Sequence, residues 1–204
     1  MNYLAHAYLS FDHPQILVGN LISDFVKGKK KFKYPPDVQK GINLHRSIDS
    51  FTDTHAATKE AKLIFHNAYR LYSGAFIDIV YDHFLANDEK EFSESSLFEF
   101  SNRVYNTIEK NIFIVPDSFA HIFPFMKKYN WLFHYRTIGG IEKSFGGMAR
   151  RAAYISEYET ACRLFEVHYQ LLGDCYRQFW NDVKPFALNT FRLLLNTSTD
   201  DPFI

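Results

Sequence analysis

Apolar residues recur at the spacing of an α-helix along almost the whole chain, and this pattern restricts the fold more than any other feature. Leu17, Leu21, Ile22 and Phe25 show it clearly, because they fall on one face of a helix with 3.6 residues per turn. Strict alternation of apolar and polar residues, which marks half-buried strands, is scarce. The sequence therefore predicts an all-α protein, and we expect a single-domain helical bundle.

Glycine, proline and a lysine cluster separate the helical segments. A chain of 204 residues without a long linker fits one domain with one well-buried core. We expect a single helical domain over 1–195 and a polar tail over 196–204. The expected helices span roughly 2–10, 14–27, 36–54, 57–70, 74–87, 95–111, 117–134, 141–152 and 157–192.

The composition limits the classes of partner and the compartment. Basic and acidic residues balance at 23 each, so no overall field favours a nucleic acid. Met1 to Ser10 lacks the basic start of a secretion signal, and no segment has the length and apolarity of a membrane span. Cys162 and Cys175 lack CxxC spacing, which argues against a zinc–thiolate site or a disulfide framework. We expect a cytoplasmic protein that binds neither nucleic acid nor membrane.

Aspartates and histidines at helical spacing are the candidate functional residues. His45 and Asp49 lie at i, i+4 in LHRSID, which places both on one helix face. Asp78 and Asp82 repeat this spacing, and His83 follows directly in YDHFL. Such groups are costly to bury without a partner, and a cation could bridge them.

Two more helices carry comparable residues, since His6 lies in a short apolar segment and Asp24 in GNLISDF. Imidazoles mixed with carboxylates suit Mn, Fe, Zn or Mg ions with open positions for water, and thus hydrolysis. The alternative for any single residue is a helix cap or a hydrogen-bonded core group, and spacing alone leaves it open. Asp53, one turn after Asp49, fits a supporting position or a C-terminal turn equally well.

Basic residues offer candidate contacts for an anionic substrate or partner. The run Lys27, Lys29, Lys30 and Lys31 directly follows Asp24, and it is either a docking patch for an acidic partner or a solvated loop. The remaining candidates contact phosphate or serve as favourable charges at helix ends. They are Arg46, Arg136, Arg150 and Arg151.

Other catalytic motifs are absent. The chain has no GxSxG elbow, no P-loop and no GxGxxG segment after a strand, and neither cysteine has a persuasive base nearby in sequence. Nucleophilic catalysis and nucleotide-cradle sites are therefore not expected.

Several motifs in one order resemble the acyl carrier protein phosphodiesterases, a family distantly similar to the HD-type metal phosphohydrolases. They are MNYLAHAYLS, GNLISDFVKG, PPDVQKGINLHRSIDSFTD, DHFL and NWLFHYRTIGGIEKSFGGMARR, so the resemblance covers roughly residues 1 to 185. It implies an HD-domain-like helical fold. The adjacent pair Asp82 and His83 departs from the His-Asp order of ordinary HD domains.

The resemblance implies an enzyme that uses Mn²⁺, or Mg²⁺, Fe²⁺ or another divalent cation, to hydrolyse 4′-phosphopantetheine from the serine of holo acyl carrier protein. The alternatives are an HD-like phosphohydrolase of a nucleotide or other small phosphoester, and a non-catalytic helical module that binds the carrier protein. The implied metal ligands, all but the first also expected to be catalytic, are His6, Asp24, His45, Asp49, Asp82 and His83, with Asp53 and Asp78 nearby.

Overall fold

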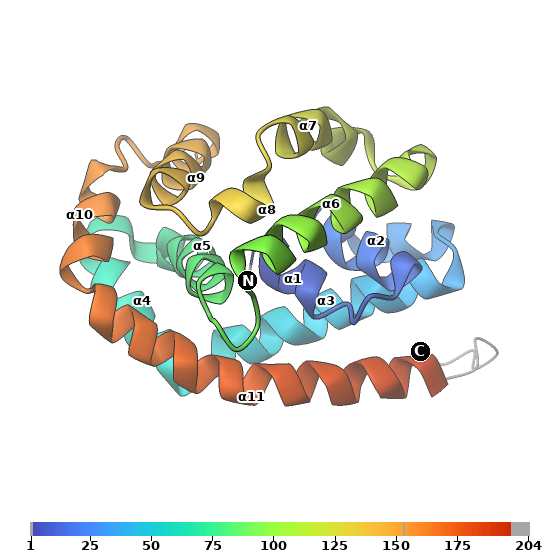
Figure 1. The fold of residues 1–204 in the computed structure, drawn as a ribbon, viewed down its shortest axis with the longest axis horizontal. Helices are drawn as coiled ribbons and strands as arrows, with labels where there is room; N and C mark the ends of the chain where they lie inside the picture. The colour runs from blue at the N-terminus through green and yellow to red at the C-terminus, as the bar shows by residue number, and fades with distance from the viewer. Residues whose placement is uncertain (1, 153, 197–204) are drawn as a thin grey trace.

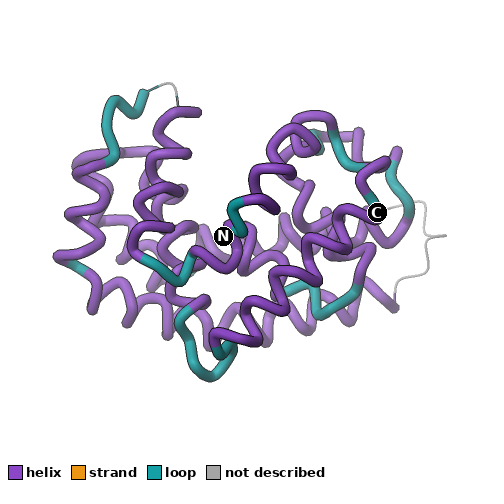
Figure 2. Tube along the Cα trace, turned by 45° about the horizontal axis from the view of Figure 1, so that its top comes forward, coloured by secondary structure: helices purple, strands orange, loops and turns teal. Residues whose placement is uncertain are grey.

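A computed structural model describes residues 2–152 and 154–196, and within these ranges the chain forms helices and no strand (Figures 1 and 2). The all-α prediction is therefore confirmed. The α-helices are α1 (Tyr3–Tyr8), α2 (Pro14–Ile22), α3 (Pro36–Thr54), α4 (Ala56–Tyr69), α5 (Ser73–Ala86), α6 (Glu94–Lys110), α7 (Asp117–Lys128), α8 (Trp131–His134), α9 (Ile138–Arg151), α10 (Glu159–Val167) and α11 (Tyr169–Asn196). Short 3₁₀ helices are η1 (Ser23–Phe25), η2 (Gly28–Lys33), η3 (Arg70–Tyr72) and η4 (Ile112–Ile114).

The short helix α1 lies at the centre of the arrangement. It packs against α2 on one side and α5 on the other, while α2 packs along α3. The long helix α11 runs beneath α3 and α4 at the lower edge of Figure 1. Because α1 contacts elements that are far apart in sequence, it can bring a side chain of the first turn next to residues of the third and fifth helices.

Local sequence explains where several helices begin. Pro14 occupies the first turn of α2, and the His13 side chain accepts a hydrogen bond from the N–H of Ile16. Helix α3 begins at Pro36, as the sequence predicts, and covers the expected range to Thr54. Proline is favoured at such positions because its fixed φ suits the first turn and its missing N–H would have no partner there.

Three predicted helix ranges need correction. The range 14–27 ends as an α-helix at Ile22 and continues as the 3₁₀ helix η1. The range 117–134 is interrupted because Asn130 adopts a left-handed conformation with φ 40° and caps α8 with its side chain. The range 157–192 divides into α10 and α11 at His168, whose φ of −105° and ψ of 17° depart from helical values. Helix α11 then extends to Asn196, and the rest of the predicted tail, 197–204, lies outside the described residues.

Helices α2 and α3 approach each other at two glycines. A Cβ atom on Gly19 would lie 2.0 Å from the carbonyl oxygen of Val38, and one on Gly41 would lie 2.2 Å from that of Ile16. Both positions therefore exclude every larger residue unless the backbones separate. This close contact sets α3 directly against the helix that carries Asn20.

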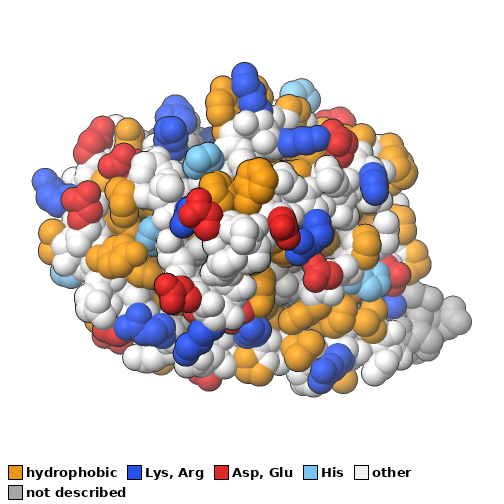
Figure 3. Space-filling model, in the orientation of Figure 1, with side chains coloured by type: hydrophobic (Ala, Val, Ile, Leu, Met, Phe, Trp, Pro, Cys, Tyr) orange, Lys and Arg blue, Asp and Glu red, His pale blue; other side chains and the backbone are white. Residues whose placement is uncertain are grey.

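The chain has 21 Phe and 13 Tyr, and many of these rings lie in the buried core. The Phe65 and Phe76 rings stack at 5.5 Å between centroids, and Phe145 meets Phe76 edge-on at 5.1 Å. At the surface, acidic and basic side chains are interspersed on the face shown in Figure 3. Within the described residues, no helix is both long enough and apolar enough to cross a lipid bilayer.

Candidate metal centre

His45 is the central residue of the site. Its Nδ1 lies 2.8 Å from the backbone oxygen of Asn20, and this contact requires the proton on Nδ1 because a carbonyl oxygen can only accept. Nε2 can then donate a proton to a carboxylate in the charged ring, or bind a cation through its lone pair in the neutral ring. That atom lies 3.1 Å from Asp24 Oδ1 and 3.0 Å from Asp49 Oδ2. Helix α2 thus orients the imidazole for the pair of carboxylates.

His6 adds a second imidazole from α1. Its ring stacks on His45 with centroids 3.9 Å apart and planes 14° apart, and its Nε2 lies 3.2 Å from Asp49 Oδ1. Although His6 is buried, neither of its ring nitrogens makes a hydrogen bond of acceptable geometry. Buried polar atoms without a hydrogen bond are uncommon in native proteins, and a metal ion is one explanation for them.

The charges in this cluster are strongly coupled. Burial alone would lower the pKa of His45, but the carboxylates of Asp24 and Asp49 raise it to about 9. Burial, and then the neighbouring His45, lower the pKa of His6 to about 4. The hydrogen bond from His45 holds the pKa of Asp24 below its usual value, and Asp49 also stays below its usual value against the opposing effect of burial. Two carboxylates therefore favour one positive charge at the position of His45 Nε2.

The donor set fits a divalent cation. Ligand atoms of His6, His45 and Asp49 all lie within 4.8 Å of one another, and Asp24 joins them through its contact with His45. Two nitrogens and one or two carboxylate oxygens suit Mn, Fe or Zn, and leave positions for water or substrate. The histidine side chains are 3% and 5% exposed, whereas those of Asp49 and Asp24 are 39% and 72% exposed. The cluster therefore has a dry imidazole side and opens to solvent at its carboxylates.

Asp82 is not part of this cluster. Its carboxylate accepts the N–H of Leu4 at 2.7 Å and that of Ala5 at 3.0 Å, so it satisfies the first turn of α1. Burial raises the pKa of Asp82 to about 7, against the effect of the two N–H donors. Asp82 therefore anchors α1, the helix that carries His6, to α5.

His83 also points elsewhere. Its Nδ1 lies 2.8 Å from the carbonyl oxygen of Tyr135 and its Nε2 lies 2.9 Å from the hydroxyl of Tyr169. Both ring nitrogens therefore have partners within the fold, and the structure does not bring His83 to the cluster. Consecutive residues of a helix point about 100° apart, so Asp82 and His83 face different neighbours.

The two aspartates expected near the metal ligands, Asp53 and Asp78, differ in environment. Asp53 is exposed at the end of α3 and pairs with Lys62 at 2.7 Å. Asp78 is half-buried on α5, where burial raises the pKa of its carboxyl and the charge of Asp49 acts in the same direction. Asp53 thus belongs to a surface ion pair, while Asp78 lies within electrostatic range of the cluster.

The lysines and arginines predicted to contact substrate or partner lie on different elements, and the lysines lie around η2. Lys27, Lys29 and Lys30 are exposed around η2, and Lys31 donates to the Asn43 side chain at 3.0 Å. These residues directly follow η1, which carries Asp24. Lys27 therefore follows the exposed Asp24 closely in the chain, and the contact of Lys31 with Asn43 ties the lysine segment to α3.

The four arginines lie on α3, α8–α9 and the end of α9. Arg46 donates to the backbone oxygen of Val26 at 2.8 Å, whereas Arg136 pairs with Glu94 at 2.7 Å. Arg150 and Arg151 are exposed, and the charge of Arg151 lowers the pKa of Tyr3 against the larger effect of burial, which raises it to about 12. Because Tyr3 lines the same small cavity as His6, Asp24 and His45, Arg151 is within electrostatic range of the site.

Asn20 is the contributor that the sequence patterns missed. It is fully buried on α2, where its carbonyl orients His45 and its side-chain amide donates to the backbone oxygen of His6 at 2.8 Å. Asn20 precedes Asp24 by four residues in an otherwise apolar segment. A polar residue on the apolar face of a helix, one turn from a candidate ligand, is the signal that would have revealed it.

Comparison with known proteins gives a consistent result. A profile of the acyl carrier protein phosphodiesterases matches residues 1–183. A protein named acyl carrier protein phosphodiesterase from Photorhabdus laumondii is 35% identical over 181 residues, covering 88% of this chain and 91% of the relative. Proteins with the same name from Yersinia pestis and from Escherichia coli O45:K1 are each 32% identical, and the alignments cover 88% of this chain and 94% of each relative.

No solved structure matches the chain, so the HD-domain-like architecture stays a prediction. The family is nevertheless established, because the profile spans most of the chain and the relatives exceed 30% identity over nearly their full length. The motifs that suggested it include the segments that carry His6, Asp24, His45 and Asp49. The chain belongs to the acyl carrier protein phosphodiesterase family.

Proposed function

We propose that this protein hydrolyses the phosphodiester between 4′-phosphopantetheine and a serine of holo acyl carrier protein, and that it does so with a divalent cation held by His6, His45 and Asp49. The observation that carries the proposal is the convergence of these residues from α1 and α3 inside the segment that matches the family. Asp24 completes the site on its solvent side.

A divalent cation in this position would neutralise phosphate charge and make a coordinated water a stronger nucleophile at neutral pH. His45 presents Nε2 because the Asn20 carbonyl holds the proton on Nδ1. Asp24, exposed at the rim, is placed to accept a proton from water. Water adds to phosphorus, the bond from phosphorus to the serine oxygen breaks, and that oxygen takes a proton from solvent.

The test uses purified protein, holo acyl carrier protein and Mn²⁺, with the mass of the carrier as the readout. We expect the carrier to lose the mass of the 4′-phosphopantetheine group, and removal of divalent cations by a chelator to stop the loss. An intact carrier together with phosphate release from nucleotides would instead identify a phosphohydrolase of small phosphoesters. An intact carrier that still binds the protein would identify a binding module.

The exposed lysines of η2 would attract the carrier, because carrier proteins are acidic and these lysines closely follow Asp24 in the chain. We expect the double variant Lys29→Glu/Lys30→Glu to raise KM for holo carrier protein about fivefold to tenfold, with kcat nearly unchanged. Steady-state kinetics at two salt concentrations measure this effect, which should shrink as salt screens the charges.

A matched control keeps the same change in net charge at a distance from η2. Lys110 and Lys143 are exposed on α6 and α9, and their double replacement by glutamate should leave KM within about twofold of the parent. Equal increases in KM for both double variants would assign the effect to net charge alone, and no increase in the η2 variant would remove the docking role of this segment.

A further inference from the structure

Three buried side-chain atoms that should be hydrogen-bonded have no partner of acceptable geometry in the part of the chain that the structure describes. They are Nδ1 and Nε2 of His6 and the side-chain oxygen Oδ1 of Asn20. His6 is 2% exposed and Asn20 is 0% exposed. Buried polar groups are nearly always paired with protein or with ordered water. These atoms on two contacting residues therefore indicate that the metal centre binds something further.

His6 and Asn20 line one small cavity, together with Asn2, Tyr3, Leu21, Asp24 and His45. Its volume is about 10 Å³, close to the space that a single water molecule needs. A buried water is stable where it has about two to four polar partners. Most of the side chains around this cavity are polar, so its size and its lining both suit one water beside the metal ligands.

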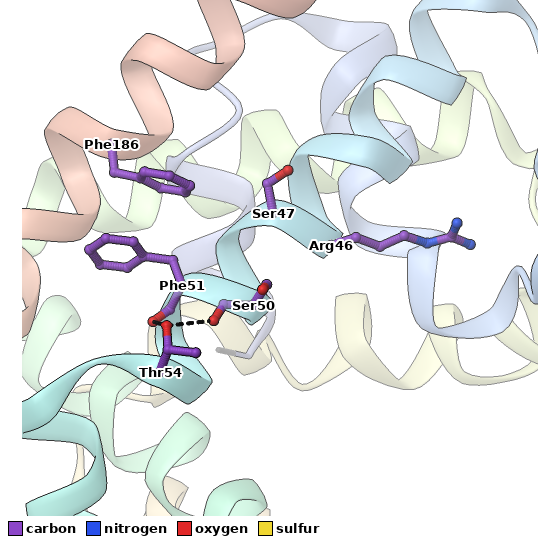
Figure 4. Close-up of a pocket in the computed structure, with 6 residues that line it drawn as sticks. All are labelled: Arg46, Ser47, Ser50, Phe51, Thr54 and Phe186. Carbon is purple, nitrogen blue, oxygen red and sulfur yellow. Dashed lines mark hydrogen bonds between the residues drawn. The ribbon is translucent and has the colours of Figure 1, made fainter. Parts of the chain in front are cut away.

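The larger groove between α3 and α11 is a separate feature (Figure 4). Ser47 and Ser50 line it from α3, and the Phe51 ring stacks on Phe186 of α11 with centroids 4.4 Å apart. The residues that line this groove include no candidate metal ligand, and none of the three unpaired atoms belongs to them. The partner that these atoms need is therefore expected in the small cavity.

The hydrogen bonds of Asn20 determine which way its side-chain amide points. The amide nitrogen Nδ2 donates to the backbone oxygen of His6 at 2.8 Å and to Ser10 Oγ at 3.0 Å. Because a carbonyl oxygen can only accept, the atom that faces it must be the amide nitrogen and not the amide oxygen. Both N–H groups of Nδ2 are thereby used, and Oδ1 remains an acceptor that needs a donor.

His6 needs the opposite kind of partner. Its Nε2 belongs to the cluster of ligand atoms and lies 3.2 Å from Asp49 Oδ1. An imidazole that binds a cation through Nε2 carries its proton on Nδ1, and this N–H almost always donates to a carbonyl, a carboxylate or a water. For His45 the acceptor is the backbone oxygen of Asn20. For Nδ1 of His6, the described residues supply no acceptor.

The stacking of the two imidazoles brings Asn20 next to both histidines. Their planes are 14° apart, and both Nε2 atoms face the carboxylate of Asp49. The Nδ1 atom of His45 meets the backbone of Asn20, while the backbone of His6 meets the Asn20 side chain. One residue of α2 thus contacts both histidines, and its unpaired acceptor complements the unpaired donor that a metal-bound His6 would have.

We propose that Asn20 positions both histidines of the metal centre. Its backbone oxygen holds the Nδ1 proton of His45, and its side-chain oxygen holds that of His6 through one water in the small cavity. The inference rests on the cation site of the proposed function, because it assigns Nε2 of His6 to the cation. The water accepts from His6 Nδ1 and donates to Asn20 Oδ1, so all three unpaired atoms gain a partner.

Asn20→Leu removes the acceptor and keeps a side chain of similar size. We expect the dissociation constant for Mn²⁺ to rise about tenfold or more, because the hydrogen bonds behind metal-binding imidazoles commonly contribute tenfold to a hundredfold in affinity. Titration followed by electron paramagnetic resonance of free Mn²⁺ measures this without substrate. At saturating Mn²⁺, KM for holo carrier protein should stay within about twofold of the parent, since Asn20 is buried.

Ser10→Ala is the matched control. Ser10 is also fully buried, and its hydroxyl donates to the same His6 carbonyl at 2.8 Å. The variant therefore loses a hydrogen bond of the same local network and leaves Oδ1 of Asn20 in place. Its affinity for Mn²⁺ should stay within about twofold of the parent. Equal weakening in Ser10→Ala and Asn20→Leu would assign the effect to loosened packing of α1 on α2 and overturn the positioning role.

A crystal structure of the Mn²⁺-loaded parent tests the water directly and needs no variant, so it decides the question even if Asn20→Leu does not fold. We expect one water at about 2.7 to 3.2 Å from both His6 Nδ1 and Asn20 Oδ1. A well-ordered centre without a water in contact with both atoms would overturn the proposal.

The two proposals fail in different ways, because Mn²⁺ affinity and the bound water are measured without carrier protein. If the parent leaves holo carrier protein intact, the proposed reaction fails, while weaker Mn²⁺ binding in Asn20→Leu alone would still support the role of Asn20. If the parent hydrolyses the carrier and Asn20→Leu binds Mn²⁺ as tightly as the parent, only the role of Asn20 fails. A parent that binds no Mn²⁺ would overturn both.

Discussion

Replacement of His45 by alanine should lower kcat/KM for holo acyl carrier protein by at least about a hundredfold, because it removes the best-oriented nitrogen of the metal centre. The same change leaves Asp24 and Asp49 without the imidazole between them. Carrier mass against time gives the rate, and elemental analysis of the dialysed protein gives the manganese content. Both should fall together.

The matched control is His66→Ala, since His66 is exposed on α4. It should retain activity and manganese within about twofold of the parent. Full activity with normal manganese in His45→Ala would contradict the assignment of the site. Normal manganese with lost activity would move His45 from metal binding to a direct role in the reaction.

Replacement of Asp82 by alanine should lower the free energy of unfolding by about 2 to 5 kcal/mol, because the buried N–H groups of Leu4 and Ala5 would each lose their acceptor. Denaturant unfolding measures this change. We expect the full loss both with Mn²⁺ and with a chelator, since the contact belongs to the protein itself.

The loss of stability measured in chelator distinguishes a hydrogen-bonding role of Asp82 from a role as a metal ligand. A metal ligand would stabilise the protein chiefly when the ion is bound, so its loss would matter little in chelator. Asp82→Asn keeps one acceptor oxygen and should lose less stability than Asp82→Ala. Asp117→Ala, at an exposed position in the first turn of α7, is the control and should change stability by about 0.5 kcal/mol or less.

The sequence predicted those parts of the structure that depend on local patterns. Helix α3 begins and ends where proline and apolar spacing indicate, and His45 and Asp49 meet because they lie one turn apart. The breaks at Asn130 and His168 escaped prediction, since the flanking apolar patterns continue across both. A left-handed asparagine is compatible with many contexts, and only the path of the chain requires it at this position.

The composition of the cluster depends on long-range packing, which the sequence patterns do not contain. His6 reaches His45 because α1 is placed between α2 and α5. The adjacent Asp82 and His83 looked like one metal-binding pair, yet their different directions on the helix send one to α1 and the other to Tyr135. The 100° step between neighbouring helical residues allows such a pair to face two different neighbours, and only the packing around α5 decides which.

The contact between Gly19 and Gly41 fixes the position of α2 relative to α3, and with it the geometry of the metal centre. Here backbone touches backbone, so no adjustable side chain can absorb a small displacement between the two helices. His45 and Asp49 follow Gly41 on α3, while Asn20 follows Gly19 on α2. The methyl group of an alanine at Gly19 or Gly41 would force α2 and α3 apart. The displacement of α3 would move both His45 and Asp49 away from His6.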